Sequence, residues 1–321
     1  MNDKVPSVTV LIAARPDQAE IGAVKAVRAL EYPTEKLEIL VARGRQPSVQ
    51  RNTAMKEARG ELIYFLDDDS VPEAGNLMRA IAYFGEPSVK IVGGPNLCPG
   101  DAPGLEQSFA LVLASWLAFG PSRARYSSVG QVRETSEKEL ILCNLVARRE
   151  TMLALGGFNE ALYPNEENAL MDEVQRRGGK LIYDPQFVVR RRPRQSLRLF
   201  AKMLMTYGRG RAEQFRLHPT PGSALNFVPP IFCVYLLALL PTHIFVGSIS
   251  LVPMTFYGLA VLTQGVVLAC GGQTLASLGA VPLIVLTHIL YGVGFWHGLF
   301  TRLKPASPAT QTHVLVEIVP R

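Results

Sequence analysis

Residues 1–220 alternate between short apolar stretches and amphipathic ones, which is the pattern of an α/β domain. Residues 7–14, 36–42 and 61–66 are rich in β-branched and aliphatic side chains and are predicted to be buried strands. Between them, residues 17–30 and 48–60 show helical spacing, and the second helix ends at a glycine. Strands that alternate with helices predict a parallel sheet with helices on its faces.

A second pattern begins at residue 226. No Asp, Glu, Lys or Arg occurs from residue 226 to residue 300. That length accommodates about three membrane spans of roughly 20 residues each, which we place near 226–247, 250–271 and 277–299. The alternative, a buried helical core of a soluble domain, is less favoured because helices of a soluble domain need a polar face toward water.

The charged residues predict how such a membrane protein is oriented. Much of the net charge of +6 comes from residues 176–216, immediately before the first expected span, and no signal-peptide pattern begins the sequence. The positive-inside rule then predicts a multi-pass protein of the inner (plasma) membrane with a cytoplasmic head. Three spans would place Arg302 and Lys304 outside, against the same rule, so the number of spans is left open. No nucleic-acid recognition motif accompanies the basic stretch, which favours anionic membrane lipids as partners.

The stretch "GELIYFLDDDSVP" joins a predicted strand to three consecutive carboxylates, Asp67, Asp68 and Asp69. In parallel sheets, ligands bind beyond the carboxyl ends of strands. Carboxylate oxygens there suit Mg²⁺ or Mn²⁺ shared with phosphate oxygens, whereas an acidic turn in water is the simpler alternative. The sequence has neither a glycine-rich turn after the first strand nor a P-loop, which argues against a Rossmann dehydrogenase and a P-loop NTPase.

Four segments in order resemble a known family. They are "RNTAMKEARGELIYFLDDDSVP", "CNLVARRETMLALGGFNEAL", "PNEENALMDEVQRRGGKLIYDP" and "RRRPRQSLRLFAKMLMTYGRGR". Together they resemble family 2 glycosyltransferases of the GT-A fold, in particular membrane-bound exopolysaccharide members such as succinoglycan-type glucosyltransferases. The resemblance covers roughly residues 6–217.

The resemblance implies a domain organisation along the chain. We expect a GT-A (Rossmann-like) nucleotide-diphospho-sugar transferase domain, then a basic interfacial helix or linker, then transmembrane helices and a short tail. The corresponding ranges are 1–193, 194–225, 226–300 and 301–321.

The resemblance also implies roles for the donor side of the site. Asp69 would ligate Mg²⁺ or Mn²⁺, Asp67 would hold the ribose or the metal shell, and Asp68 would lie at the nucleotide. Arg15 and Arg51 are candidates for the nucleotide pocket, although Arg51 could equally cap a helix or form a pair on a helix surface. Where many relatives carry an Asp that contacts the base, this chain has "VARGRQPS", so a UDP-sugar is only slightly favoured over a GDP-sugar.

By register with the family, Glu167 occupies the position of the catalytic base, which takes the proton of the acceptor hydroxyl. Glu166 is the second candidate, since this chain has Glu-Glu where relatives have Glu-Asp. Both could instead be helix-start charges that are stabilised by the helix dipole. Arg192 and Arg194 are candidates for binding the diphosphate through their forked guanidinium groups, or they form a membrane-facing cluster.

The resemblance thus implies a membrane-anchored, metal-dependent inverting glycosyltransferase. It would move a sugar from a nucleotide-diphosphate donor to a lipid-linked saccharide acceptor at the cytoplasmic face, in exopolysaccharide or surface-glycan assembly. One alternative is a polyprenyl-phosphate glycosyltransferase, whose acceptor phosphate needs no strong base. Another is a catalytically inactive scaffold that binds a nucleotide sugar within a glycan assembly complex.

Overall fold

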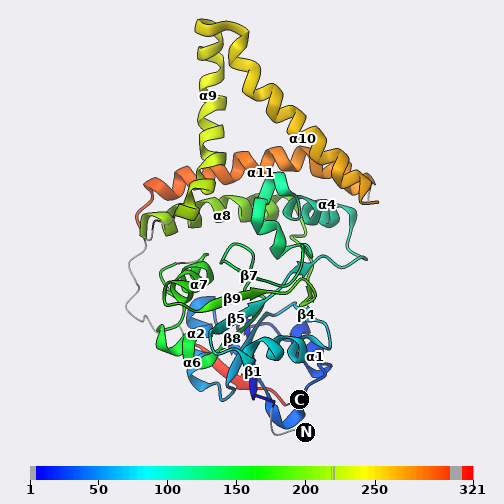
Figure 1. Cartoon of the computed structure of the whole chain (residues 1–321), viewed down its shortest axis with the longest axis vertical. Helices are drawn as coiled ribbons and strands as arrows, with labels where there is room; N and C mark the ends of the chain where they lie inside the picture. Colours follow the sequence, from blue (N-terminus) through cyan, green and yellow to red (C-terminus); the bar gives the residue numbers. More distant parts are fainter. Residues whose placement is uncertain are drawn as a thin grey trace. The chain divides into compact units, whose positions relative to one another are not determined.

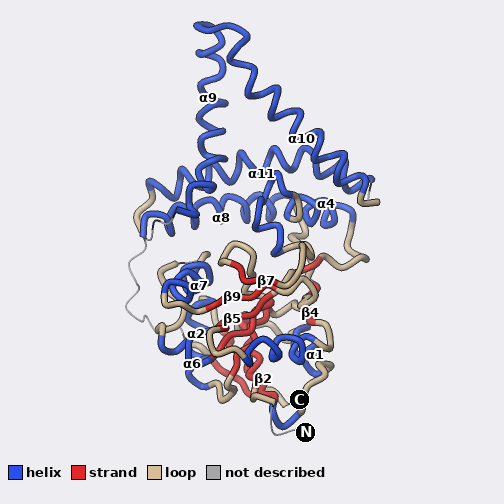
Figure 2. The backbone as a smooth tube through the Cα atoms, in the orientation of Figure 1, coloured by secondary structure: helices blue, strands red, loops and turns tan. Residues whose placement is uncertain are grey.

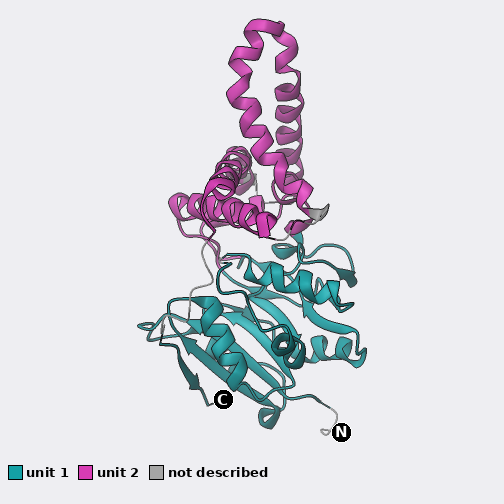
Figure 3. Cartoon of the chain, turned by 90° about the vertical axis from the view of Figure 1, so that its left-hand side faces the viewer, with its two compact units in different colours: residues 1–99, 124–191, 304–321 teal, residues 100–123, 192–303 magenta. Residues whose placement is uncertain are grey.

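The computed structural model describes residues 5–162, 164–217, 219, 221–272, 274–303 and 313–320. The chain divides into two compact units, drawn in different colours in Figure 3. One consists of Met1–Pro99, Ala124–Arg191 and Lys304–Arg321, and the other of Gly100–Arg123 and Arg192–Leu303. Neither unit is one continuous stretch, because the chain leaves the first unit twice and returns to it twice.

The first unit is built on a mixed sheet with the strand order β11-β2-β1-β3-β8-β5-β9-β7 among the described residues (Figure 1). β1, β2 and β3 run parallel, and β8 pairs antiparallel with β3. The three strands predicted from the apolar stretches are confirmed to within a residue at each end. The strands are β1 (Val8–Ala14), β2 (Leu37–Arg43), β3 (Leu62–Asp67), β5 (Val89–Gly93), β7 (Arg133–Thr135), β8 (Asn144–Arg148), β9 (Lys180–Tyr183) and β11 (Leu315–Ile318).

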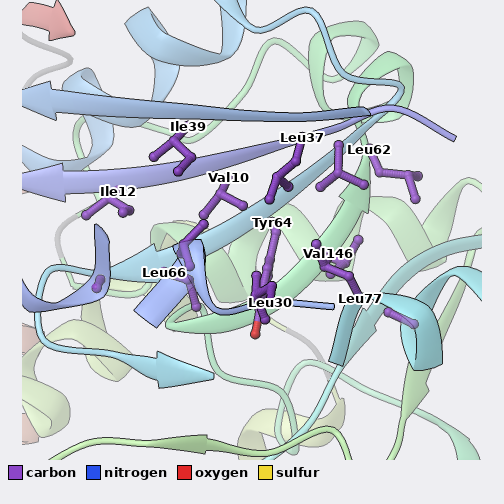
Figure 4. Packing of buried hydrophobic residues seen from close by; sticks show 14 of the residues in the cluster. Val10, Ile12, Leu30, Leu37, Ile39, Leu62, Tyr64, Leu66, Leu77 and Val146 are labelled. Atoms are coloured by element: carbon purple, nitrogen blue, oxygen red, sulfur yellow. The ribbon is translucent and has the colours of Figure 1, made fainter. Parts of the chain in front are cut away.

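Helices cover both faces of this sheet. Side chains of Val10, Tyr64 and Val146 pack with Leu77 on one face, as Figure 4 shows, while Leu11 and its neighbours face the other. This alternation follows from the two-residue period of a strand and explains why β1 is apolar throughout. The helices and 3₁₀ turns of this unit are α1 (Gly22–Arg28), η2 (Thr34–Lys36), α2 (Pro47–Glu57), α3 (Asn76–Ile81), η3 (Ala82–Gly85), α6 (Arg149–Ala154) and α7 (Glu166–Arg176).

A small second sheet includes the strand that follows the aspartate triplet in the sequence. It consists of β4 (Val71–Pro72), β10 (Val189–Arg190) and β6 (Asn96–Leu97), with β10 in the middle. β10 runs antiparallel to β4, with Arg190 opposite Val71. The residue after β10, Arg191, therefore lies beside the segment that carries the triplet.

The C-terminal strand β11 pairs antiparallel with β2, from Leu315 opposite Arg43 to Ile318 opposite Leu40. The sequence analysis assigned 301–321 to a tail without a predicted element, and residues 304–312 and 321 of that tail lie outside the described residues. Residues from the far end of the sequence thus extend the sheet next to its predicted nucleotide edge.

The second unit is helical (Figure 2). Two of its stretches are long and apolar enough to cross a membrane, Ser223–Cys270 and Leu275–Phe300, so the expectation of about three spans is not confirmed. Its elements are α4 (Gly104–Leu113), α5 (Trp116–Phe119), η4 (Gly120–Arg125, which ends in the first unit), α8 (Leu197–Leu217), η5 (Pro221–Phe227), α9 (Val228–Val246), η6 (Gly247–Leu251), α10 (Val252–Cys270) and α11 (Thr274–Phe300).

Candidate active site

The aspartate triplet lies at the carboxyl end of β3. The backbone N–H of Asp67 donates to the Ser70 hydroxyl oxygen at 3.2 Å, and the carbonyl oxygen of Asp68 accepts from the N–H of Ala23 at 3.0 Å. These bonds fix the turn and connect it to the start of α1. The carboxylates of Asp67 and Asp69 keep access to solvent, since their side chains are 25% and 52% exposed.

Arg191 bridges two carboxylates of the triplet. Its Nη1 lies 2.8 Å from Asp67 Oδ2, and its Nε pairs with Asp69. The run of arginines at 190–194 includes Arg191, but the sequence analysis favoured its neighbours Arg192 and Arg194. The signal that could have found it is the pairing of β10 with β4, which is set by contacts far apart in the sequence.

Arg51 joins the triplet to the acidic pair. Its Nη2 lies 3.2 Å from Asp67 Oδ1, and its Nη1 lies 3.2 Å from Glu166 Oε1. The Arg51 side chain is only 9% exposed, so it does not form a pair on a helix surface. α2 thus holds a cation between the end of β3 and the start of α7.

Glu166 and Glu167 begin α7 and differ in environment. Glu166 is buried, and its Oε2 accepts from the N–H of Asn165 at 3.1 Å. Burial and the negative charge of Glu167 raise the pKa of Glu166 to about 7, although Arg51 opposes the shift. Glu167 is only partly buried. The carboxylate of Glu166 is therefore bound by Arg51 and the backbone of Asn165, whereas the carboxylate of Glu167 is more accessible to a ligand.

Asn165 precedes this pair in a left-handed conformation, with φ at 110°. Its Oδ1 accepts from Asn168, while its buried Nδ2 has no hydrogen-bond partner among the described residues. A buried amide donor that lacks a partner is costly unless a ligand satisfies it. Sequence reasoning did not identify Asn165, although it belongs to the "PNEEN" segment.

Asn52 supports the segment that leads to α7. Its Oδ1 accepts from the N–H of Phe158 and its Nδ2 donates to the carbonyl oxygen of Phe158, both at 2.8 Å. Gly157 has φ at +79°, and a Cβ there would lie 2.4 Å from Asn52 Oδ1. These two hydrogen bonds therefore join the Arg-Asn segment to the Gly-Gly-Phe segment, which follows about 100 residues later in the sequence.

The predicted nucleotide side lies at the ends of β1 and β2. Arg15 follows β1 and is exposed. Arg43, at the end of β2, donates to the carbonyl oxygen of Gln18 at 2.6 Å and pairs with Glu317 of β11 at 2.9 Å. β2 thus contains no Asp that could contact the base of a nucleotide. Glu317 of β11 instead pairs with Arg43, and Arg43 supports the loop that carries Arg15.

Arg192 and Arg194 belong to the helical unit. Arg192 donates to both carboxylate oxygens of Glu106 in α4, at 2.9 and 3.2 Å, while Arg194 is exposed. Their role in binding the diphosphate stays a prediction.

The described residues hold no group of three or more His, Cys, Asp or Glu side chains that could bind a metal ion by itself. Asp67 and Asp69 nevertheless offer oxygen donors that share one cation, Arg191. Mg²⁺ is commonly held by one or two carboxylates together with substrate phosphates. The donor set therefore fits a divalent ion whose remaining ligands come from a bound diphosphate.

The burial of Glu166 makes stability depend on pH. Its pKa of about 7 lies above the ordinary value of 4.5, so the folded chain binds this proton more tightly than the unfolded chain does. The free energy of unfolding should therefore fall as pH rises from about 5 through 7 and then level off. We expect a lower thermal midpoint at pH 8 than at pH 6, measured by circular dichroism, and a smaller difference in Glu166→Gln. An unchanged difference in that variant would contradict this origin.

Comparison with known proteins places this geometry in a family. Residues 2–206 match the family model described as "Glycosyltransferase like family 2". The chain belongs to glycosyltransferase family 2. This match confirms the family that the four sequence segments indicated.

Two curated relatives of this family 2 chain are similar over about 60% of its length. The succinoglycan biosynthesis protein ExoA of Rhizobium meliloti is 28% identical over 199 residues, which cover 60% of this chain and 56% of ExoA. The pre-mycofactocin glycosyltransferase of Mycobacterium tuberculosis is 26% identical over 204 residues, which cover 62% of this chain and 39% of that protein. The matched region thus spans about half the length of these relatives.

A solved structure supports the fold of this family 2 chain. The mannosyltransferase PcManGT from Pyrobaculum calidifontis, in complex with GDP-Man and Mn²⁺, superposes with a TM-score of 0.58 over 88% of this chain and 87% of that one. The sequence identity is 18%. The similarity therefore supports the GT-A-like α/β fold expected from the sequence.

Proposed function

We propose that this chain is a membrane-anchored, metal-dependent inverting glycosyltransferase. It transfers a sugar from a nucleotide-diphosphate donor to a lipid-linked saccharide acceptor at the cytoplasmic face of the plasma membrane, in assembly of an exopolysaccharide or surface glycan. The observation that carries this proposal is the chain of charges Asp69–Arg191–Asp67–Arg51–Glu166 at the strand ends of a family 2 fold.

The donor binds along the ends of β1, β2 and β3 in this proposal. Arg15 and Asp68 line the nucleotide, and Asp67 and Asp69 hold a divalent ion together with the diphosphate oxygens. When bound, Mg²⁺ or Mn²⁺ offsets the negative charge that develops on the departing diphosphate. Arg191, which pairs with both carboxylates, would offer its forked guanidinium group to the diphosphate.

Glu167 acts as the base. It accepts the proton of the acceptor hydroxyl while that oxygen bonds to the anomeric carbon and the bond to the diphosphate breaks, which inverts the configuration. Glu166 positions the pair, since Arg51 holds it from one side and the backbone of Asn165 from the other. The Nδ2 of Asn165, which finds no hydrogen-bond partner in the described part of the chain, is suited to a sugar hydroxyl.

The membrane part of the proposal rests on the two apolar stretches of the helical unit. A protein held at the bilayer meets a lipid-linked acceptor at a high effective concentration. The similarity to ExoA, named as a succinoglycan biosynthesis protein, supports a polysaccharide product.

The test is release of nucleoside diphosphate by the full chain in detergent. UDP-glucose, UDP-galactose and GDP-mannose are supplied in turn with Mn²⁺, Mg²⁺ or EDTA, and a membrane lipid extract supplies acceptors. We expect one donor to be consumed only with metal, and Asp69→Ala to lower the rate by at least roughly 100-fold. The exposed Asp101 provides a matched control, because Asp101→Ala should retain the parent rate.

The products and variants separate the rival functions. A product in which the sugar is bonded to the lipid phosphate itself, formed even when Glu166 and Glu167 are both Gln, would instead support the polyprenyl-phosphate transferase. Metal-dependent binding of a donor without turnover on any acceptor would support the inactive scaffold.

A further inference from the structure

The pairing of β11 with β2 constrains how often the chain crosses a membrane. The chain leaves the sheet unit after Arg191 and rejoins it at 304–321, where β11 adds to the same sheet that carries the aspartate triplet. Both ends of the segment 192–303 are therefore attached to one folded body. A segment that starts and ends on the same side of a bilayer crosses it an even number of times.

α11 is packed against the strongly charged helix α8. Three glycines permit this contact: a Cβ at Gly208 of α8 would lie 2.1 Å from the carbonyl oxygen of Tyr291, one at Gly294 would lie 2.2 Å from that of Met205, and one at Gly298 would lie 2.4 Å from that of Arg209. α8 carries charges along its whole length: Arg198, Lys202, Arg209, Arg211, Glu213 and Arg216. If α11 crossed the bilayer, α8 would have to cross with it, and each charge at the bilayer centre is costly.

The N-terminal end of α11 contacts α4, which in turn packs on α8. The Ser108 hydroxyl of α4 donates to the carbonyl oxygen of Ala276 at 2.9 Å, and Phe109 of α4 stacks on Phe200 of α8 at 4.2 Å between ring centroids. α4, α8 and α11 are drawn side by side in Figure 1. Protein buries 44% of the apolar window of α11, against 11% for the stretch that contains α9 and α10. α11 is therefore covered by its own protein to a much greater extent than α9 and α10 are.

α9 and α10 have the opposite character. They project from the other helices of this unit as a hairpin, as Figure 1 shows, and each has 19 residues. At 1.5 Å per residue such a helix is about 28 Å long, close to the roughly 30 Å of a bilayer core. Neither helix has a charged residue, and both expose large apolar side chains, among them Leu237, Phe245, Phe256 and Leu262 at 62–86%.

We propose that the hairpin α9–α10 crosses the bilayer twice, while α4, α8 and α11 lie along the membrane surface on the side of the catalytic sheet. The inference rests on the membrane-bound part of the proposed function. The lipid chains are the partner of the exposed apolar side chains, and η6 at the tip of the hairpin emerges on the opposite side. Polar groups lie at this tip, where His243 Nδ1 contacts the carbonyl oxygen of Gly247 and the hydroxyl of Ser250.

The experiment is labelling of single cysteines in the full chain, in sealed vesicles of both orientations, with a maleimide that does not cross membranes. Cys98 and Cys270, which are not buried, are replaced by Ser. Ser248→Cys reports the tip of the hairpin, His313→Cys the segment before β11, and Lys25→Cys on α1 the catalytic side; all three positions are exposed. Release of nucleoside diphosphate is measured in the same vesicles.

We expect Ser248→Cys to be labelled at least 10-fold more in one vesicle orientation, and the other two variants in the opposite orientation. If His313→Cys shares the orientation of Ser248→Cys, the number of crossings is odd and the inference is wrong. If Ser248→Cys is labelled together with Lys25→Cys, or in neither orientation, the hairpin does not cross. If nucleoside diphosphate is released although the labelling contradicts the topology, the proposed transferase function still holds and only the topology is wrong. If the labelling is as expected but no nucleoside diphosphate is released, only the topology is supported.

Discussion

Exchanging Glu167 for Gln is expected to lower kcat by roughly 100- to 10,000-fold, which is the usual contribution of a general base. Gln keeps the size of the side chain and removes its ability to take a proton. Because Glu167 is only partly buried and the contacts that define the turn belong to its neighbours, the fold and the binding of donor should be nearly unchanged. Turnover and donor affinity are measured side by side in the assay of nucleoside-diphosphate release.

Glu173 provides the matched control for this substitution. It lies on the same helix and pairs with Arg176 and Arg177 near the surface, and such pairs contribute little to stability. Glu173→Gln should therefore turn over at close to the parent rate. If Glu166→Gln abolishes turnover while Glu167→Gln retains it, the base is Glu166 and the assignment by family register is wrong.

Exchanging Arg51 for Met is expected to destabilise the sheet unit by about 3 kcal/mol, because removal of one partner leaves a buried charge uncompensated. The affected groups are Glu166, with a side chain that is 3% exposed, and Asp67, which is 25% exposed. The loss should be greater at pH 8 than at pH 6, since protonation of Glu166 relieves the charge. The buried thiol of Cys143 reports unfolding of this unit, through the urea concentration at which it becomes reactive.

The control is Arg59→Met, which removes a guanidinium that is 81% exposed and lies 4.0 Å from Glu38. A pair of this kind contributes at most about 1 kcal/mol. Combining Arg51→Met with Glu166→Gln should recover part of the lost stability, because no carboxylate is then left buried without a partner at that position. Equal losses in Arg51→Met and Arg59→Met would show that the buried contacts of Arg51 contribute no more than a surface pair.

The central strands could be predicted because each is a short continuous run of apolar residues, and α2 because it fills the segment between two such runs. β1 to β3 and α2 are of this kind, and the aspartate triplet follows from its position after β3. The first helix begins at Gly22 and not near residue 17, because the residues after β1 form a loop that Arg43 holds through the carbonyl oxygen of Gln18.

The parts that could not be predicted depend on contacts between distant residues. Arg191 differs from Arg192 and Arg194 only through the register of β10 against β4, which no local pattern encodes. Glu317 lies in a strand of only four residues, and its contact with Arg43 depends on the pairing of that strand with β2. The apolar stretches themselves were evident, but α11 has the composition of a membrane span, and only its packing on the charged α8 distinguishes it.

The position of β11 also has a consequence for biosynthesis. Residues 315–318 emerge from the ribosome only after the charge-free helices, so β2 remains an open edge while those helices are being synthesised. An unpaired edge is a template for association with other chains. Expression of the sheet unit without the residues that follow the helices would leave this edge permanently open, and aggregation of such a fragment would reflect the missing strand as much as the missing apolar helices.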